Sequence, residues 1–213
     1  MSKIKICKNG PYLVSDNLPL NEDVVEYDDQ DFPLKTQKGK ILTEDKEYSL
    51  CRCGHSCNKP FCDGSHHTVN FDGTENIKAK QKHEDIANRF DGPDLILKDA
   101  TELCAGAGFC ERAGGVWYLV ENSNDLENKK TATEECQCCP SGRLIIVDKK
   151  TGQSIEPKLD PSIGIPENGP LCVKGGVLIE SSEGFTYESR NRITLCRCGK
   201  SQNKPFCDGS HQD

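Results

Sequence analysis

Short runs of apolar and β-branched residues, broken by glycine, proline and Asn-Gly pairs, occur at both ends of this chain and predict small strands. These runs are Ile4–Cys7, Tyr12–Val14, Lys174–Glu180 and Phe185–Glu188. Two more, Tyr48–Leu50 and Ile193–Leu195, lead directly into Cys-x-Cys sequences. The pattern therefore predicts two β-rich ends.

The middle of the chain has a different periodicity, which predicts helices alternating with strands. We expect the order strand, helix, strand, helix, strand over Asp94–Lys98, Thr101–Arg112, Val116–Val120, Thr131–Cys138 and Leu144–Asp148. Glu121–Lys130 is expected to be an exposed charged loop. The predicted class is α+β, with a first unit at residues 1–70, a ferredoxin-like β-α-β-α-β middle domain at 71–150 and a second unit at 151–213.

Sixteen residues are written twice in this chain, and the two copies differ at only two positions. Both copies have the spacing C-x-C-x8-C-x3-H, which supplies a complete set of four ligands for a metal site. The candidate ligands are Cys51, Cys53, Cys62 and His66 in the first copy and Cys196, Cys198, Cys207 and His211 in the second. Cys57 is excluded because Gln202 occupies its position in the second copy.

The repeat extends upstream, since Asn9–Val14 recurs as Asn168–Val173. The duplication therefore covers a domain-sized unit rather than a loop. From Asn9 to Cys51 is 42 residues and from Asn168 to Cys196 is 28, so the first copy holds extra residues. We expect them in a loop at the acidic segment Glu22–Asp31.

Composition limits the possible partners and the compartment. With 34% apolar residues, 6% aromatics and 14 cysteines in 213 residues, the chain needs more than apolar burial to stabilise small units. The net charge of −7 disfavours a nucleic-acid or anionic-membrane partner. The sequence shows no signal peptide and no apolar run of about 18 residues, so we expect a cytoplasmic protein. In that reducing compartment, clustered cysteines are metal ligands more often than disulfides.

The C-x-C pair, the Asn-Lys-Pro-Phe segment and the string CDGSH, all present twice, resemble the CDGSH iron-sulfur domain of the mitoNEET-like family. The resemblance implies two [2Fe-2S] clusters, one on each ligand set. In each, the C-x-C pair would hold one iron, and the third cysteine and the histidine would hold the other. Because single-repeat relatives dimerise, the two units of this chain are expected to form an intramolecular pseudo-dimer within a monomer.

A single histidine ligand has consequences for the chemistry of such a cluster. Exchanging one thiolate for imidazole removes one negative charge, so the potential should lie above that of plant-type ferredoxins and below that of two-histidine Rieske centres. Histidine also titrates, which predicts release of the cluster in acid. The expected function is one-electron transfer, redox sensing or cluster transfer to an unidentified redox or acceptor protein.

Two alternatives belong to other classes. Zinc could occupy the same ligands, which would make the chain a zinc-stabilised structural or interaction module. An enzyme would need a second cofactor or substrate site, and the sequence contains neither a G-x-G-x-x-G after a strand nor a P-loop. We therefore expect no enzymatic activity.

The middle segment resembles a divergent single-cluster ferredoxin through Cys104, Cys110 and the Cys139-Pro140 pair. The position of the central cysteine of the bacterial pattern is Ala107. Three thiolates suit a three-iron cluster, or a four-iron cluster if Cys136 or Cys138 completes the set. Alternatively, these cysteines are core residues.

Other residues near the repeats have structural interpretations. We expect Cys172 to be a small core residue, and Asp63 and Asp208 to organise turns. We expect solvated charges at the basic residues around the loops, which are Arg52, Lys59, Arg197 and Lys204.

Overall fold

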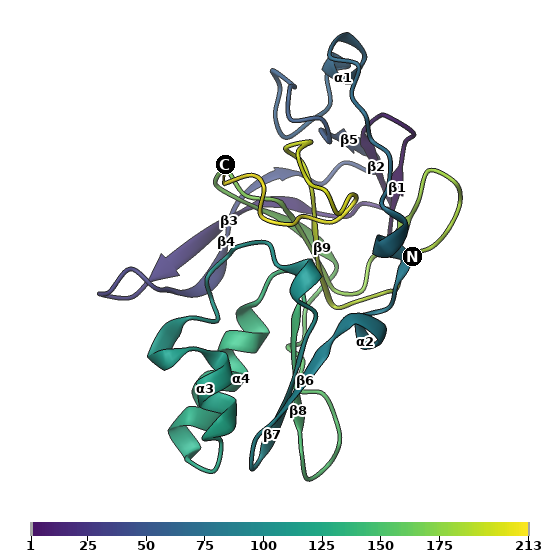
Figure 1. Cartoon of the computed structure of the whole chain (residues 1–213). Helices are drawn as coiled ribbons and strands as arrows, with labels where there is room; N and C mark the ends of the chain where they lie inside the picture. The colour runs from purple at the N-terminus through teal and green to yellow at the C-terminus, as the bar shows by residue number, and fades with distance from the viewer. Residues whose placement is uncertain (1, 213) are drawn as a thin grey trace.

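In the computed structural model, which describes residues 2–212, the strands form three sheets and short helices join them (Figure 1). The first sheet has the order β11 (Leu178–Glu180), β1 (Lys3–Ile6), β2 (Tyr12–Ser15), β5 (Tyr48–Leu50). The second has the order β12 (Arg192–Leu195), β10 (Leu171–Lys174), β9 (Ser162–Pro166), β3 (Leu20–Tyr27), β4 (Pro33–Thr43). The third has the order β6 (Asn88–Asp91), β7 (Leu95–Asp99), β8 (Leu144–Asp148). The protein is therefore α+β, as the sequence predicts.

The helices are short except for one. They are α1 (Ser65–Thr68), α2 (His83–Ile86), α3 (Val116–Glu121) and α4 (Leu126–Cys138), with 3-10 turns at Ile77–Lys80, Thr101–Leu103 and Arg112–Gly114. Among residues 2–212, no helix has both the length and the apolar character needed to cross a membrane.

The first two sheets exchange strands with one another. In each half, a strand pairs antiparallel with the strand that follows it, β1 with β2 and β9 with β10. The next strand of each half then joins the other sheet, where β3 pairs parallel with β9 and β11 pairs parallel with β1. Buried residues of both halves, among them Ile4, Tyr12, Ile163 and Leu195, form one continuous hydrophobic core. The two repeats therefore fold around a common interior.

Two predictions for the ends of the chain are wrong in detail. Lys174–Glu180 is not a single strand, because Gly175 and Gly176 have φ values of +76° and +71° and turn the chain between β10 and β11. Phe185–Glu188 forms only an isolated bridge, between Thr186 and Glu180.

The extra residues of the first repeat form a hairpin rather than a loop. β3 and β4 pair from Leu20–Thr43 to Tyr27–Pro33, and the acidic segment Glu22–Asp31 provides most of β3 and the turn. In Figure 1 this hairpin is the purple-blue arm that extends from the second sheet. Its alternation of buried and exposed residues is typical of a strand with one covered face.

An ion pair fastens the exchanged strand β3 to the second repeat. Lys174 Nζ lies 2.9 and 2.7 Å from the two carboxylate oxygens of Asp23, whose side chain is 2% exposed. Gly164 leaves room for this carboxylate, since a Cβ atom there would lie 2.0 Å from Asp23 Oδ2. The pair thus depends on close approach of β3 to β9.

Replacement of Asp23 by alanine is expected to lower the free energy of unfolding by about 1–3 kcal/mol, because it leaves a part-buried ammonium group without its partner. Urea denaturation measures the loss. The exposed Glu26–Lys35 pair on the same hairpin is the control, and Glu26→Ala should cost about 0–1 kcal/mol. A loss for Asp23→Ala no greater than for Glu26→Ala would contradict the prediction.

The middle segment departs from the predicted β-α-β-α-β order. Its elements follow the order β6, β7, α3, α4, β8, and all three strands pair antiparallel in one sheet. The helix predicted at Thr101–Arg112 is a loop with short 3-10 turns, because Gly106 and Gly108 adopt φ values of +70° and +73°. This ferredoxin-like topology was therefore predicted wrongly, although β7, α4 and β8 lie where strands and a helix were expected.

Residues 116–121 form helix α3 instead of the strand predicted at Val116–Val120. The buried residues Val116, Leu119 and Val120 are spaced i, i+3, i+4 and so form one helical face. A short apolar run cannot be assigned to strand or helix by its pattern alone. The charged loop predicted at Glu121–Lys130 is shorter, since the Asp125 side chain accepts hydrogen bonds from the amides of Glu127 and Asn128 and begins α4.

Candidate metal centres

The two sixteen-residue loops have the same backbone structure. Strand β5 ends at Leu50, which forms a bridge with Phe61, and the Cys51 amide donates to the Pro60 carbonyl at 2.8 Å. In the second loop the Leu195–Phe206 bridge and the Cys196–Pro205 hydrogen bond of 2.9 Å are the counterparts. Each loop therefore folds back on its strand and brings the third cysteine beside the C-x-C pair.

Aspartate organises the turn before each histidine, as the sequence predicts. Asp63 Oδ1 accepts hydrogen bonds from Ser65 Oγ at 2.7 Å and from the Ser65 amide at 3.0 Å, and Oδ2 accepts from the Cys57 amide at 2.7 Å. These bonds hold the pKa of Asp63 well below its usual range, the Ser65 hydroxyl having the largest effect. Asp208 makes the same bonds to Ser210 and to the Gln202 amide. Cys57 itself is exposed.

The eight candidate ligands lie in four pairs. Cys51 Sγ and Cys53 Sγ are 3.8 Å apart, and Cys62 Sγ lies 3.4 Å from His66 Nδ1. In the second loop the Cys196–Cys198 and Cys207–His211 distances are 3.6 and 3.3 Å. Two sulfur ligands at about 2.3 Å from a tetrahedral metal are about 3.8 Å apart, and a sulfur and a nitrogen about 3.5 Å. Each pair is thus spaced to bind one tetrahedral metal ion.

The candidate ligands come together as pairs and not as larger groups. Among residues 2–212, no three cysteine, histidine, aspartate or glutamate side chains surround one common point at metal-binding distance. In the second C-x-C pair, the hydrogen bond between the sulfurs raises the pKa of Cys196 and lowers that of Cys198 to about 5. A hydrogen bond between the two sulfurs favours the thiolate form of one of them, and metal binding requires that form.

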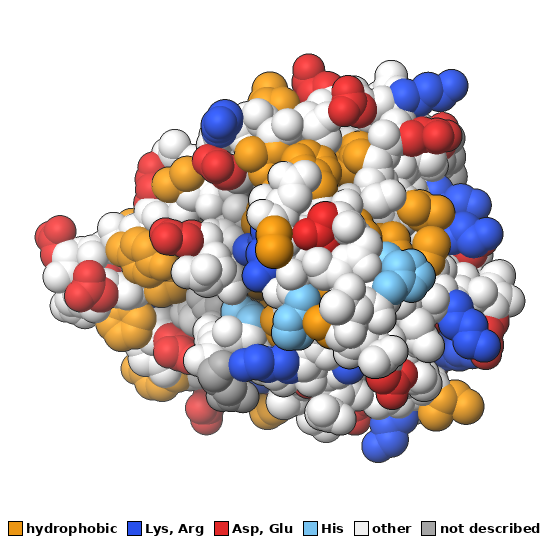
Figure 2. Space-filling view, turned by 90° about the horizontal axis from the view of Figure 1, so that it is seen from above, with side chains coloured by type: hydrophobic (Ala, Val, Ile, Leu, Met, Phe, Trp, Pro, Cys, Tyr) orange, Lys and Arg blue, Asp and Glu red, His pale blue; other side chains and the backbone are white. Residues whose placement is uncertain are grey.

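The two C-x-C loops touch each other. A Cβ atom on Gly54 would lie 2.4 Å from the Cys198 carbonyl oxygen, and one on Gly199 would lie 2.6 Å from that of Cys53. Both glycines have φ values near +80°, at +82° and +81°. This reciprocal contact sets the two sites side by side, and histidine side chains gather on the face seen in Figure 2.

The first repeat also contributes directly to the second site. The Tyr12 hydroxyl donates to the carbonyl of Cys196 at 2.7 Å and lies 3.2 Å from that of Pro205. Tyr12 is completely buried, and burial raises its pKa far above the usual range. It therefore acts as a fixed hydrogen-bond donor across the two repeats.

Arg52 corrects the prediction that the basic residues of the loops are solvated. Its side chain is 1% exposed and lies over the rings of Tyr12 and Phe71, at 5.5 and 5.7 Å from their centroids. Phe71 also packs against Cys51 and Cys53. No carboxylate forms an ion pair with Arg52 among residues 2–212, and its Nε lacks a hydrogen-bond partner there.

A buried cation without a counter-charge is costly unless an anion lies nearby. An iron-sulfur cluster with three thiolates carries net negative charge, so the surroundings of Arg52 fit such a group at the first site. Of the other basic residues, Lys59 is exposed, Lys204 donates to the Ser201 carbonyl, and Arg197 is partly buried.

The middle segment covers the third-cysteine loop of the second site. Asn203 Nδ2 donates to the Glu102 carbonyl and Gln212 Nε2 donates to the Gly106 carbonyl, both at 2.9 Å. Cys207 is 2% exposed, whereas Cys62 of the first site is only partly buried. The two candidate metal sites thus differ in how deeply their third cysteine is buried, although their loops are nearly identical in sequence.

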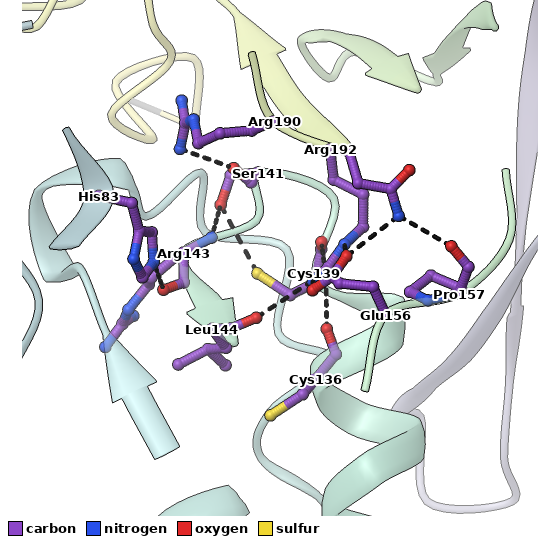
Figure 3. A network of polar contacts seen from close by, with 11 residues as sticks. His83, Cys136, Cys139, Ser141, Arg143, Leu144, Glu156, Pro157, Arg190 and Arg192 are labelled. Atoms are coloured by element: carbon purple, nitrogen blue, oxygen red, sulfur yellow. Dashed lines mark hydrogen bonds and ion pairs between the residues drawn. The ribbon is translucent and has the colours of Figure 1, made fainter. Parts of the chain in front are cut away.

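Two arginines join the second repeat to the loop at the end of α4 (Figure 3). Arg192 donates to the carbonyls of Cys136, Cys139 and Leu144 and pairs with Glu156. Arg190 donates to the Ser141 carbonyl at 3.4 Å and lies 5.0 Å from the centroid of the Phe206 ring. Arg190 therefore links Phe206, the residue before Cys207, to Ser141, which follows Cys139 in the sequence by two positions.

The five cysteines of the middle segment differ in their surroundings. Burial raises the pKa of Cys110 to about 12, and the neighbouring sulfurs of Cys139 and Cys104 contribute to the rise. Cys136 and Cys139 are buried in the core of this segment. Cys138 instead donates to the Leu34 carbonyl on β4. The sulfurs of Cys104 and Cys139 thus both lie near that of Cys110, whereas Cys138 bonds to another partner.

Cys172 and His83, which lie outside the candidate metal sites, have structural roles. Cys172 is 3% exposed in β10, as the sequence predicts for a core residue. His83 is buried, and its Nε2 lies 2.8 Å from the Arg143 carbonyl. All 14 cysteines lie within the described residues, and none forms a disulfide.

Sequence reasoning missed a cavity of about 940 Å³ beside the second site. Its walls come from the β3–β4 hairpin, the loop 105–109 of the middle segment and the Arg197–His211 side of the second site. These segments are far apart in the sequence, and no motif in any of them indicates that they meet.

Comparison with protein families agrees with this architecture. Residues 9–67 and 168–212 each match the family described as "Iron-binding zinc finger CDGSH type". The chain belongs to the CDGSH family, whose domain it carries twice. Residues 90–149 of this tandem CDGSH protein match the family described as "Divergent 4Fe-4S mono-cluster". No curated protein and no solved structure matched the chain. The matches support iron-sulfur cluster binding by the protein.

Proposed function

We propose that this tandem CDGSH protein binds one [2Fe-2S] cluster at each repeat and acts in one-electron transfer or redox sensing. Cys51 and Cys53 would hold one iron of the first cluster, and Cys62 and His66 the other. In the second, Cys196 and Cys198 would hold one iron, and Cys207 and His211 the other. When bound, each cluster would take up and release a single electron.

The spacing of the ligand pairs is the observation that carries this proposal. A single tetrahedral zinc ion needs four ligands around one point, whereas a two-iron cluster needs two ligands at each of two points. The pair distances of 3.3 to 3.8 Å fit a tetrahedral ion of either kind, but among residues 2–212 no third candidate ligand joins a pair around one point, which favours the second arrangement. Arg52 gives further support, because it is buried, has no ion-pair partner among residues 2–212 and would favour an anionic group nearby.

We further propose that the two repeats form an intramolecular pseudo-dimer in a monomeric, cytoplasmic protein. The reciprocal pairing of β3 with β9 and of β11 with β1, together with the contact of Gly54 and Gly199 with the opposite loops, supports a pseudo-two-fold arrangement. The role proposed is a non-enzymatic one, in which a redox or cluster-acceptor protein is the partner. Transfer of the cluster to such a partner is part of the same proposal.

For the middle segment we propose a third, higher-nuclearity cluster on Cys104, Cys110 and Cys139. The family match of this segment and the proximity of Cys104 and Cys139 to Cys110 support it. Of the two candidates for a fourth ligand, Cys136 is favoured because Cys138 is bonded to the β4 backbone.

Iron and acid-labile sulfide per chain, measured with electron paramagnetic resonance of the reduced protein, test these proposals. Four irons with a signal typical of [2Fe-2S] clusters are expected from the CDGSH sites, and seven or eight if the middle segment is also loaded. A colourless aerobic preparation with two zinc ions per chain would instead indicate the zinc-stabilised module.

A further inference from the structure

The arginines of the two repeated loops have different surroundings although their loops match. In the first repeat, a segment of the same chain covers Arg52. Arg52 Nη2 donates to the Gly73 carbonyl at 2.7 Å, its guanidinium lies 5.7 Å from the Phe71 ring centroid, and the Gly73 amide donates to Asn9 Oδ1 at 3.0 Å. Arg52 and Asn9 thus hold the segment Phe71–Gly73 by one ring contact and two hydrogen bonds.

The second repeat has the same holding groups, and no segment among residues 2–212 pairs with them as Phe71–Gly73 does in the first. Arg197 corresponds to Arg52, and its Nε donates to the Gly169 carbonyl at 2.6 Å. Within residues 2–212, neither Nη of Arg197 has a hydrogen-bond acceptor and no aromatic ring lies over its guanidinium. Asn168 corresponds to Asn9 and has a similar φ, +52° against +49°. Its exposed side chain makes no hydrogen bond within the described residues.

The cavity of about 940 Å³ lies on this side of the second site. Arg197, Gly169 and His211 line it, and they are the counterparts of Arg52, Gly10 and His66. The hairpin lines it with both charged and apolar residues, and among the apolar ones Val24 and Tyr27 are 52% and 59% exposed. Exposed apolar side chains beside an open cavity are typical of a surface that a partner covers.

We infer that this cavity binds a peptide segment of a partner protein. In that segment, an aromatic residue is followed two positions later by a residue whose backbone carbonyl accepts from Arg197 and whose backbone amide donates to Asn168. In the first repeat the chain itself provides such a segment, Phe71–Gly73. The two residues that hold it by hydrogen bonds, Arg52 and Asn9, have their counterparts beside the cavity. A peptide is favoured over a free aromatic molecule because the counterparts of these two groups, Arg52 and Asn9, bind the carbonyl and the amide of one residue, Gly73.

This inference deepens the proposed function, on which it rests, by placing the redox or acceptor partner at the second site. An aromatic side chain in the cavity would lie beside His211 and so near one iron of that site. The partner would therefore engage the two repeats unequally, because Phe71 already occupies the equivalent place at the first.

The test uses the full-length, iron-loaded protein and a capped peptide that copies Val69–Asn76. Proton NMR is recorded on the peptide with substoichiometric, dithionite-reduced protein. We expect the phenylalanine ring signals to broaden saturably, because a bound ring would lie beside a paramagnetic site. The same peptide with alanine in place of phenylalanine should show no such broadening. Absence of broadening by the native peptide, or equal effects of both peptides, would overturn the inference.

The two repeats supply a matched pair of variants. Asn168→Gly keeps the left-handed backbone, removes the acceptor and should weaken peptide binding about 2- to 10-fold. Asn9→Gly makes the same change where the chain covers itself and should leave binding unchanged. Arg197→Gln should weaken binding about tenfold or more, since it removes a charged donor. Equal weakening by Asn9→Gly and Asn168→Gly would contradict the assignment.

Iron and sulfide analysis of the same samples separates this inference from the proposed function. A fully loaded protein that fails to bind the peptide contradicts the docking site alone. A protein without iron-sulfur clusters contradicts the proposed function, and the docking inference with it.

Discussion

Replacement of both His66 and His211 by cysteine is expected to lower the reduction potential of the CDGSH sites by on the order of 100 mV. A fourth thiolate adds one negative charge to each site, which disfavours the uptake of an electron. The change should also reduce the loss of cluster in mild acid, because the imidazole that competes for a proton is absent. Redox titration followed by absorbance, and the decay of visible absorbance at pH 5.5 to 6, measure the two effects.

The matched control for these variants is His55→Lys, which introduces the residue that the second repeat has at Lys200. His55 is exposed and is not one of the paired ligands, so both potential and acid lability should stay unchanged. If the double His-to-Cys variant behaves like wild type, the three-cysteine, one-histidine ligand set is wrong. The single variants His66→Cys and His211→Cys show whether the two sites differ in reduction potential or in acid lability.

Alanine at Gly54 or at Gly199 is expected to lower the free energy of unfolding by roughly 2–5 kcal/mol. The left-handed backbone costs an alanine about 1–2 kcal/mol, and a new Cβ 2.4 or 2.6 Å from a carbonyl oxygen forces the two loops apart. Each substitution should also lower the iron content of both sites, because Gly54 touches Cys198 and Gly199 touches Cys53. Urea denaturation and iron per chain are the measurements.

Gly152→Ala separates backbone strain from the contact between the loops. Gly152 has a φ of +71°, but nothing lies within 4 Å of a Cβ placed there. Its replacement should therefore cost about 1–2 kcal/mol and leave the iron content unchanged. If Gly54→Ala costs no more than Gly152→Ala, or disturbs only its own site, the loops are not in the close contact described.

Residues near each other in the sequence were predicted well. The repeated loop contains all four of its own candidate ligands, and local hydrogen bonds such as those of Asp63 and Asp208 shape it. Comparison of the two copies also predicts that Cys57 is not a ligand, and this cysteine is exposed. The strands β2, β5 and β12 were predictable because each is a short apolar run beside a turn.

The errors occur where a pattern is compatible with two structures. The run at Val116–Val120 fits a strand or one helical face, and its helical form depends on packing against the core of the middle segment. The segment that forms most of β3 was expected to be a loop. Its acidic composition hides the alternation of buried and exposed residues in β3, which pairs with both β4 and β9.

The sequence by itself determined the two candidate ligand sets, their turns and the equivalence of the two repeats, because these depend on chemistry within sixteen residues. Only the tertiary structure decided how the repeats differ. Phe71 buries Arg52 in one repeat, whereas Arg197 borders a cavity in the other, and the middle segment covers Cys207 but not Cys62. These differences arise from contacts between residues distant along the chain, and the local pattern, being the same in both copies, carries no information about them.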